Sequence, residues 1–382
     1  MVAGCMMPAM REGVGRIAPI ADTAQRRWAR ENLRGLMNLF LPSFHPGTNK
    51  LDEEAIRHDV RHAIAQGFSG TMPMINWTLP GTEQWQQLHR IIVDEAGDDL
   101  PLHGIVAGRG VGSDGRVLAA LEEVGAKLIL LASSYPGDSG NNQLYDLMAA
   151  RIEATQLPIM LYAATGKRAF PALGPSGQPL DVYDRIANLG NVVAVKISQP
   201  VSLTSTMQLC ERLGNRLSMG PVNLEFLPQL ARRYEISWSG QWNAEAVQTP
   251  QNQIGNQLLA ASRKGDLVGL GELAERFRPA LSHFFKVQAP VIRQGAHPWQ
   301  HNRYYQWLSG GNGGLLPHDP HAPEGSIPIL DAAARAEMRA AFIASGLRPT
   351  ESSEEQFVVG RAAWKRGVRA SELTDLPYYS EA

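Results

Sequence analysis

Apolar and polar positions along the chain predict strands and helices in strict turn from about residue 35. Short apolar runs typical of buried parallel strands are each followed by a segment with apolar residues one helical turn apart, as at Ile56, Val60 and Ile64. The predicted strands are 36–41, 70–75, 102–107, 127–132, 157–162, 191–196, 216–219 and 235–238. The first predicted helix begins at Asp52 and ends at Gly67. The other predicted helices of this region are 83–96, 115–124, 142–154, 180–188, 203–213 and 224–233.

Eight strands, each followed by a helix, predict a (β/α)₈ TIM barrel. A doubly wound sheet usually stops near six strands and carries a glycine-rich phosphate turn after the first, which residues 42–47 lack. Three further helices are expected at 256–262, 267–285 and 331–345, with a Gly/Pro-rich connection at 308–329. We therefore expect an N-terminal arm over 1–30, a barrel over 31–262 and a C-terminal helical extension over 263–382.

Composition narrows the class of partner. Apolar residues make up 44% of the chain, enough for a sizeable core, and 36 basic side chains nearly balance 37 acidic ones. This balance argues against a nucleic-acid partner and favours a small molecule. No apolar run is long enough to predict a membrane span. The two cysteines, Cys5 and Cys210, form no disulfide framework, so we expect a cytoplasmic protein.

A lysine closes the sixth predicted strand, Asn191–Lys196. Burial disfavours the charged ammonium and lowers the pKa of a lysine, and a neutral amine can attack a carbonyl to form a Schiff base. The alternative is a lysine that extends from the strand end into solvent. In a barrel, catalytic groups lie at the C-terminal ends of strands, where Tyr162 ends strand five and Tyr135 follows strand four. A tyrosine hydroxyl near the amine can both donate and accept a proton.

These residues resemble the dihydrodipicolinate synthase / N-acetylneuraminate lyase family, a group of class I, Schiff-base-forming aldolases and dehydratases. The resemblance covers roughly residues 31–347. Its most specific feature is the order and spacing of a tyrosine, in Leu161-Tyr162, and a lysine, in Val193-Ala194-Val195-Lys196. An entry segment, Pro42-Ser43-Phe44, and a turn, Ser218-Met219-Gly220, also match family positions.

The resemblance implies that Lys196 forms an imine with a 2-oxo acid or aldehyde and that Tyr162 relays protons. It places Tyr135 where synthases of the family carry a second relay tyrosine, and Gly220 at a substrate-binding turn. It also implies a TIM barrel, no organic cofactor and a homo-oligomer, a tetramer or a dimer. The sequence does not separate an aldolase from a dehydratase, because both share the imine step.

One segment departs from the family. The family binds the substrate carboxylate with Gly-Thr-Thr-Gly-Glu after strand two, whereas this chain has Asn76, Trp77 and Thr78 there. An asparagine amide and a threonine hydroxyl can still donate hydrogen bonds, but the glycines that allow close backbone approach are gone. The substrate is then held differently, or is larger and more apolar. Lys167 or Arg168, in the long loop after strand five, is a candidate partner for an anionic substrate.

Two other functions stay open. A barrel that kept the lysine but lost the chemistry would act as a ligand-binding or regulatory protein. A metal-dependent enzyme would use the histidines near the C-terminal connection, although they show no clean ligand spacing and we assign no metal ligand. These histidines are His297, His301, His318 and His321.

Overall fold

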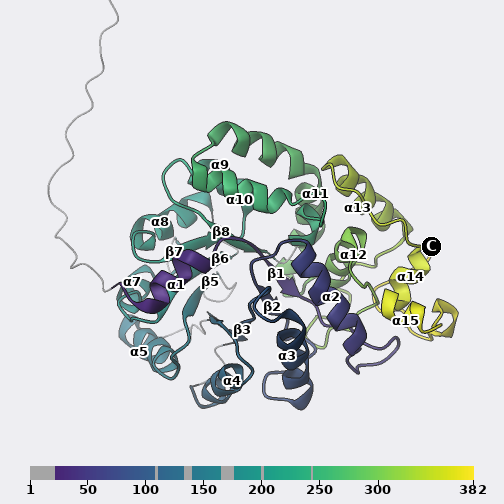
Figure 1. Ribbon diagram of the computed structural model, residues 1–382, viewed down its shortest axis with the longest axis horizontal. Helices are drawn as coiled ribbons and strands as arrows, with labels where there is room; N and C mark the ends of the chain where they lie inside the picture. The colour runs from purple at the N-terminus through teal and green to yellow at the C-terminus, as the bar shows by residue number, and fades with distance from the viewer. Residues whose placement is uncertain (1–21, 108–110, 133–139, 165–175, 199–201, 242–243) are drawn as a thin grey trace, which may run out of the picture.

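Eight parallel strands form the centre of the computed structural model and helices surround them (Figure 1). The structure describes residues 22–107, 111–132, 140–164, 176–198, 202–241 and 244–382. The strands are β1 (Gly35–Phe40), β2 (Thr71–Pro73), β3 (His103–Val106), β4 (Leu128–Ala132), β5 (Ile159–Ala164), β6 (Val192–Ser198), β7 (Ser218–Pro221) and β8 (Trp238–Gln241).

The strand order closes into a barrel. Parallel ladders join β2, β1 and β8 in one sheet and β3 to β7 in another. A parallel bridge from Thr71 to Leu102 connects β2 with the start of β3, and the Ser239 hydroxyl donates to the Pro221 carbonyl oxygen at 2.7 Å between β8 and β7. The predicted TIM barrel is therefore confirmed.

The helices of the barrel follow the apolar periodicity of the sequence. Asp52 caps α2 by accepting a hydrogen bond from the Ala55 amide, and Ile56 and Val60 are buried on its inner face. Strands seven and eight begin later than predicted, and a 3₁₀ turn, η1 (Leu224–Phe226), precedes a single turn of helix where a longer helix was predicted. The barrel helices are α2 (Glu53–Ala65), α3 (Glu83–Ala96), α4 (Val111–Glu123), α5 (Asn141–Ile152), α7 (Leu180–Ile186), α8 (Leu203–Leu213), α9 (Leu227–Leu230) and α10 (Ile254–Lys264).

A helix that the sequence did not predict, α1 (Ala24–Asn32), lies across the N-terminal ends of the strands (Figure 1). Ala29 and Leu33 are buried against the barrel's interior residues, including Leu128 and Trp238. Arg26 is also buried and donates hydrogen bonds to carbonyl oxygens just before and at the start of β6, among them Ala187 at 2.6 Å. Within the arm expected over 1–30, residues 24–30 thus belong to a helix that packs against the barrel, while residues 1–21 lie outside the described part of the chain.

The C-terminal extension packs against the barrel and shares its core. Two helices were predicted as such, α11 (Leu267–Arg293) and α13 (Ala332–Ala344), the second capped by Asp331. Between them lies α12 (Trp299–Ser309), which the sequence did not predict and in which every residue is buried. Shorter elements follow or bridge: η2 (Ala244–Val247), α14 (Glu354–Val359), α15 (Arg361–Lys365) and η3 (Ala370–Glu372). Among the helices in the described ranges, none combines the length and apolar character that a bilayer crossing requires.

Candidate active site

Lys196 lies in the middle of β6, a strand in which all seven residues are buried. In the register of the sheet it is flanked by Tyr162 on β5 and Gly220 on β7. Its side chain is 4% exposed, with Nζ 3.8 Å from the Met72 sulfur. Gly240 of β8 also borders the amine: a Cβ there would lie 3.6 Å from Nζ, an ordinary contact, but only 2.9 Å from the Met72 methyl, so the glycine leaves room for Met72. The amine is therefore enclosed by apolar atoms and does not extend into solvent.

Burial lowers the pKa of Lys196 to about 7. The physical cause is the loss of hydration of the ammonium form inside the barrel. A large fraction of the amine is then neutral near pH 7, which is the state that attacks a carbonyl carbon.

Tyr162 faces the same space from the neighbouring strand. Lys196 Nζ lies 5.8 Å from the centre of the Tyr162 ring, and the tyrosine hydroxyl donates to the Ser198 hydroxyl at 3.3 Å. Burial raises the pKa of Tyr162 above its ordinary value, so the phenol keeps its proton at neutral pH. The pair therefore brings a proton donor beside a neutral amine.

The two side chains open into a cavity of about 230 Å³ at the C-terminal ends of the strands. Its polar lining groups in the described residues are those of Lys196, Tyr162, Ser198, Asn76 and His297. The rest of the lining is mainly apolar and includes Leu39, Met74, Ile75, Ile105, Leu130, Val222 and Trp299. A carbonyl compound of small to moderate size fits this arrangement.

Comparison with known proteins gives a consistent family. No family model matches the chain. The 4-hydroxy-tetrahydrodipicolinate synthase of Rhodopseudomonas palustris is 26% identical over 261 residues, which is 66% of this chain and 82% of that protein. The corresponding synthase of Listeria innocua is 22% identical over 271 residues, 68% of this chain and 86% of its own.

Solved structures share the fold. The 4-hydroxy-tetrahydrodipicolinate synthase of Methylacidiphilum fumariolicum superposes with a TM-score of 0.63 at 17% identity, covering 82% of this chain and 96% of that one. Dihydrodipicolinate synthase of Thermotoga maritima superposes with a TM-score of 0.65 at 16% identity, covering 82% of this chain and 99% of that one. By sequence and by fold, this chain is similar to the dihydrodipicolinate synthases. It is an enzyme of the class I, Schiff-base-forming lyases and aldolases.

The segment that departs from the family lies partly at the cavity. Asn76 lines it, and its amide donates to Asp319 of the C-terminal extension at 3.0 Å. Trp77 and Thr78, which the sequence analysis assigned to substrate binding, are outside the lining. The Trp77 indole donates to the Pro317 carbonyl oxygen at 3.1 Å. The Thr78 hydroxyl donates to the Met74 carbonyl oxygen at 3.2 Å. These two side chains fasten the loop, and their assignment to the substrate stays a prediction.

Gly220, which the sequence analysis placed at a substrate-binding turn, lies on β7 beside a tryptophan. A Cβ at this position would lie 2.3 Å from the Trp238 ring, whose indole nitrogen donates to the Ser218 hydroxyl at 2.9 Å. The glycine therefore makes room for a tryptophan inside the barrel, and it is not part of the cavity lining. Tyr135, Lys167 and Arg168 lie outside the described residues.

The histidines of the C-terminal extension do not converge. His297 lines the cavity and stacks on Trp299 with ring centres 4.6 Å apart, and burial lowers its pKa to about 4, which keeps it neutral. His301 is buried beside Tyr305 and Met338, while His318 pairs with Asp375 at 3.0 Å on the surface. His321 is exposed. Within the described residues no group of three His, Cys, Asp or Glu side chains is placed to hold a metal ion.

Three polar or aromatic residues of the lining, Ser198, His297 and Trp299, were not assigned to the site from the sequence. The predicted strand ended at Lys196, but β6 runs two residues further, and the alternation of side chains along a strand places Ser198 on the face of Lys196. The two-residue spacing of Lys196 and Ser198, which puts both on one face of a strand, was visible in the sequence. His297 and Trp299 come from a segment about a hundred residues downstream, and no local pattern connects them with the strand ends.

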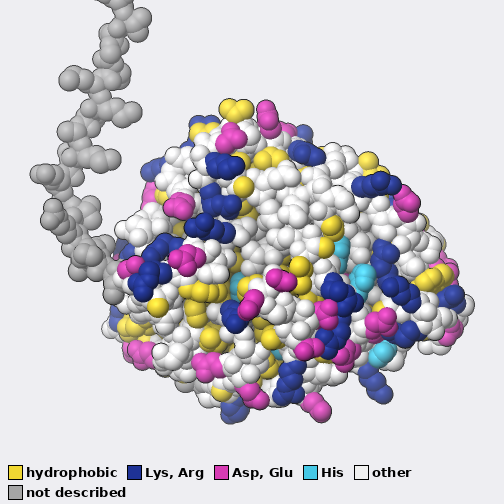
Figure 2. Space-filling model, viewed as in Figure 1, with side chains coloured by type: hydrophobic (Ala, Val, Ile, Leu, Met, Phe, Trp, Pro, Cys, Tyr) yellow, Lys and Arg dark blue, Asp and Glu magenta, His cyan; other side chains and the backbone are white. Residues whose placement is uncertain are grey.

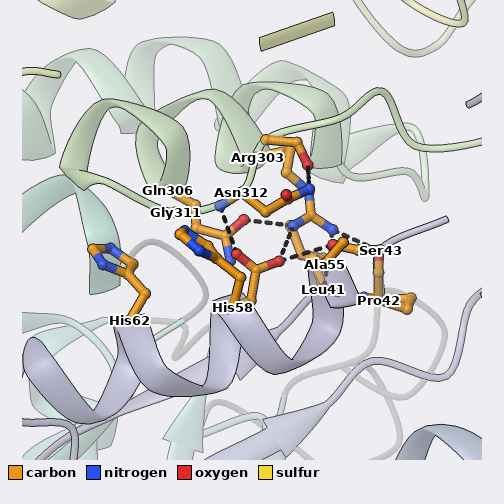
Figure 3. A network of polar contacts seen from close by, with 12 residues as sticks. Leu41, Pro42, Ser43, Ala55, His58, His62, Arg303, Gln306, Gly311 and Asn312 are labelled. Atoms are coloured by element: carbon orange, nitrogen blue, oxygen red, sulfur yellow. Dashed lines mark hydrogen bonds and ion pairs between the residues drawn. The ribbon is translucent and has the colours of Figure 1, made fainter. Parts of the chain in front are cut away.

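A buried ion pair holds α12, and with it Trp299, against the barrel (Figure 3). Arg303 and Asp59 are both fully buried, 3.0 Å apart. Arg303 also donates to Gln306 and to the carbonyl oxygens of Leu41 and Pro42, after β1. Asp59 accepts hydrogen bonds from the Ser43 hydroxyl at 2.8 Å and the Asn312 amide at 2.7 Å. The extension is therefore tied to the loop after β1 and to α2.

Proposed function

We propose that this protein is a lyase that forms a Schiff base between Lys196 and a 2-oxo acid, with Tyr162 as the proton relay. The observation that carries the proposal is the enclosed amine of Lys196, whose pKa is lowered to about 7 by burial, beside a protonated phenol in a cavity. Tyr135 is retained as a second relay in the proposal, on the resemblance to the family.

The proposed reaction begins with attack of the neutral Nζ on the ketone carbon. The carbon–nitrogen bond forms, and the carbonyl oxygen takes a proton from the Tyr162 hydroxyl to give a carbinolamine. The nitrogen then gives a proton to the Tyr162 phenolate, Tyr162 passes that proton to the hydroxyl, which leaves as water, and a protonated imine results beside the phenolate. This iminium withdraws electrons from the neighbouring carbon, which permits aldol cleavage, condensation or loss of water.

The lining supports a substrate with an apolar body. Lys196 is the one cationic side chain among the described lining residues, and it is consumed by the imine. Asn76 and Ser198 supply neutral hydrogen-bonding groups for a carboxylate, and we propose Lys167 or Arg168 as its charged partner. We expect 2-oxo acids with an apolar side chain to react better than pyruvate. A homo-oligomer acting on a small molecule is also part of the proposal, and rests on the family resemblance.

Borohydride trapping tests the proposal. The protein is incubated with each member of a panel of 2-oxo acids, reduced and digested, and the peptide containing Lys196 is weighed. We expect the mass of the reduced adduct on Lys196 and none in Lys196→Met. A folded protein that gives no adduct with any 2-oxo acid or aldehyde would favour the ligand-binding alternative. Loss of activity with a chelator would instead support the metal-dependent alternative.

A further inference from the structure

We propose a second ligand site, for a small molecule carrying two or more phosphate or carboxylate groups, in an arginine-lined cavity at the N-terminal end of the barrel. The cavity measures about 380 Å³ and lies beneath α1. Four arginines line it: Arg26, Arg30, Arg34 and Arg216. Glu235 is the single acidic side chain in the described lining. Four guanidinium groups against one carboxylate give this cavity a strong positive charge, although the chain as a whole carries a formal charge of −1.

The positive charge is only partly neutralised by neighbouring side chains. Arg216 pairs with Asp184, and Arg30 pairs with the exposed Asp22. Arg34 donates to the Arg30 carbonyl oxygen, and among the described residues no carboxylate forms an ion pair with it. Buried Arg26 donates to backbone carbonyl oxygens of the segment before β6. An anion in the cavity would offset the repulsion among these cations.

Arg216 supplies an independent sign that the site is incomplete. Its side chain is 6% exposed, and its Nε is buried without a hydrogen-bond partner. Buried donors in folded proteins are almost always paired, because an unpaired one loses its hydration without compensation. The pKa of Arg26 is lowered, first by its own burial and second by the positive charge of nearby Arg216. Two largely buried guanidinium groups close together are an arrangement that an oxyanion stabilises.

The chemistry of the lining selects the ligand class. A guanidinium group presents planar N–H pairs that match the two oxygens of a carboxylate or phosphate. Figure 2 shows Lys and Arg side chains gathered over the region where Figure 1 draws α1, with acidic side chains between them. Such interspersed charge does not make the continuous basic surface that a nucleic acid needs. A compact anion enclosed by the cavity fits better.

This cavity is distinct from the one at Lys196. β6 runs between the two, since Val193 lines the arginine cavity and Lys196, three residues further along the strand, lines the other. The inference therefore does not rest on the proposed lyase reaction. A ligand bound here would lie at the opposite ends of the strands from the carbonyl substrate.

Isothermal titration calorimetry with pyrophosphate and, separately, citrate tests the site in a buffer of low ionic strength. We expect saturable binding to one site per chain for at least one of the two probes. Arg34→Gln and Arg30→Gln should each weaken binding about tenfold, because a hydrogen-bonded charge contact is lost. About 0.5 M sodium chloride should weaken it as well. Arg90→Gln, an exposed arginine on α3, is the matched control and should bind like the wild type.

Two outcomes would overturn the proposal. One is the absence of saturable binding with both probes. The other is binding that survives both arginine substitutions but is lost in Lys196→Met, which would place the anion in the Lys196 cavity. A preference for pyrophosphate over citrate would identify a phosphate ligand, and the reverse a polycarboxylate.

Discussion

At the scale of single residues, the proposed chemistry depends on an amine that the fold buries. Lys196 is enclosed by Met72, Gly240 and Tyr162, and burial lowers its pKa to about 7. The unfolded chain would present a lysine with a pKa of about 10.4. Protonating the amine is therefore easier in the unfolded chain, so the same burial that prepares the nucleophile reduces stability.

Replacing Lys196 with methionine should consequently stabilise the protein while abolishing imine formation. Below pH 7 the wild type must fold with a charged buried amine, and the full penalty, of the order of 4 kcal/mol, applies. Between about pH 7 and pH 10 the unfolded wild type binds more protons than the folded one, so wild-type stability rises and the advantage of the variant shrinks. Urea unfolding across this range measures the difference. A difference that does not change with pH would contradict the lowered pKa.

Replacing Tyr162 with phenylalanine should slow the reaction without removing the nucleophile. The phenol stays protonated because burial raises its pKa, and its loss removes the proposed donor to the carbinolamine. We expect the rate of imine trapping at Lys196 to fall about a hundredfold, and less in Ser198→Ala, which removes only the partner of the phenol. Single-turnover trapping measures both rates. Unchanged rates in Tyr162→Phe would remove the tyrosine from the mechanism.

The central pair of the site could be predicted from the sequence, because two parallel strand ends carry it. Adjacent strands of a barrel are neighbours in space, and the register indeed pairs Tyr162 with Lys196. Trp77 and Thr78 were assigned to the substrate from the family's segment, and the sequence did not show that both side chains donate hydrogen bonds to backbone carbonyl oxygens. His297 could not be found in this way, since it reaches the cavity from a distant segment.

At the scale of elements, an ion pair in the interior joins α12 to α2. Neither Arg303 nor Asp59 has any exposed side-chain surface. Desolvation makes such a pair a weak source of net stability, but removing one partner leaves an uncompensated buried charge. The pair therefore selects the position of α12 on the barrel more than it stabilises the fold.

Asp59→Ala should destabilise the protein by about 3–5 kcal/mol, because it leaves the buried guanidinium of Arg303 without its ion-pair partner. Adding Arg303→Met should restore part of the loss, because the unpaired charge is then gone. The control is Glu275→Ala, which breaks an exposed pair with Arg278 and should cost less than about 1 kcal/mol. Chemical denaturation measures all three. A double variant no more stable than Asp59→Ala would contradict this reading.

The repeating elements were predictable and the covering ones were not. Buried strands and amphipathic helices carry periodic apolar patterns, which is why the barrel could be read from residue 35 onward. α1 and α12 were not predicted from the sequence, for opposite reasons. α1 carries four charged residues in nine and looks like a surface segment, although Arg26 and Ala29 are buried. α12 is buried on all sides, so it shows no polar face and no helical period.

At the scale of the whole molecule, the barrel and the C-terminal extension share one core. A continuous set of packed apolar side chains runs from Leu36 of β1 to Phe357 of α14 and Tyr379 near the C-terminus. The division at residue 262 therefore remains a proposal about sequence segments. We expect a single calorimetric unfolding transition, because separating the extension would expose the outer face of the barrel. Two resolved transitions would show that the parts fold independently.

The central claim is that the fold holds the Lys196 amine largely neutral near pH 7. Competitive labelling with trace acetic anhydride across a pH series, with Nα-acetyl-lysine as an internal standard and the Lys196 peptide quantified by mass, measures this directly. Labelling of Lys196 should reach half its maximum near pH 7, and labelling of the standard should reach half its maximum at about pH 10.4. A Lys196 profile that coincides with the standard would contradict the account.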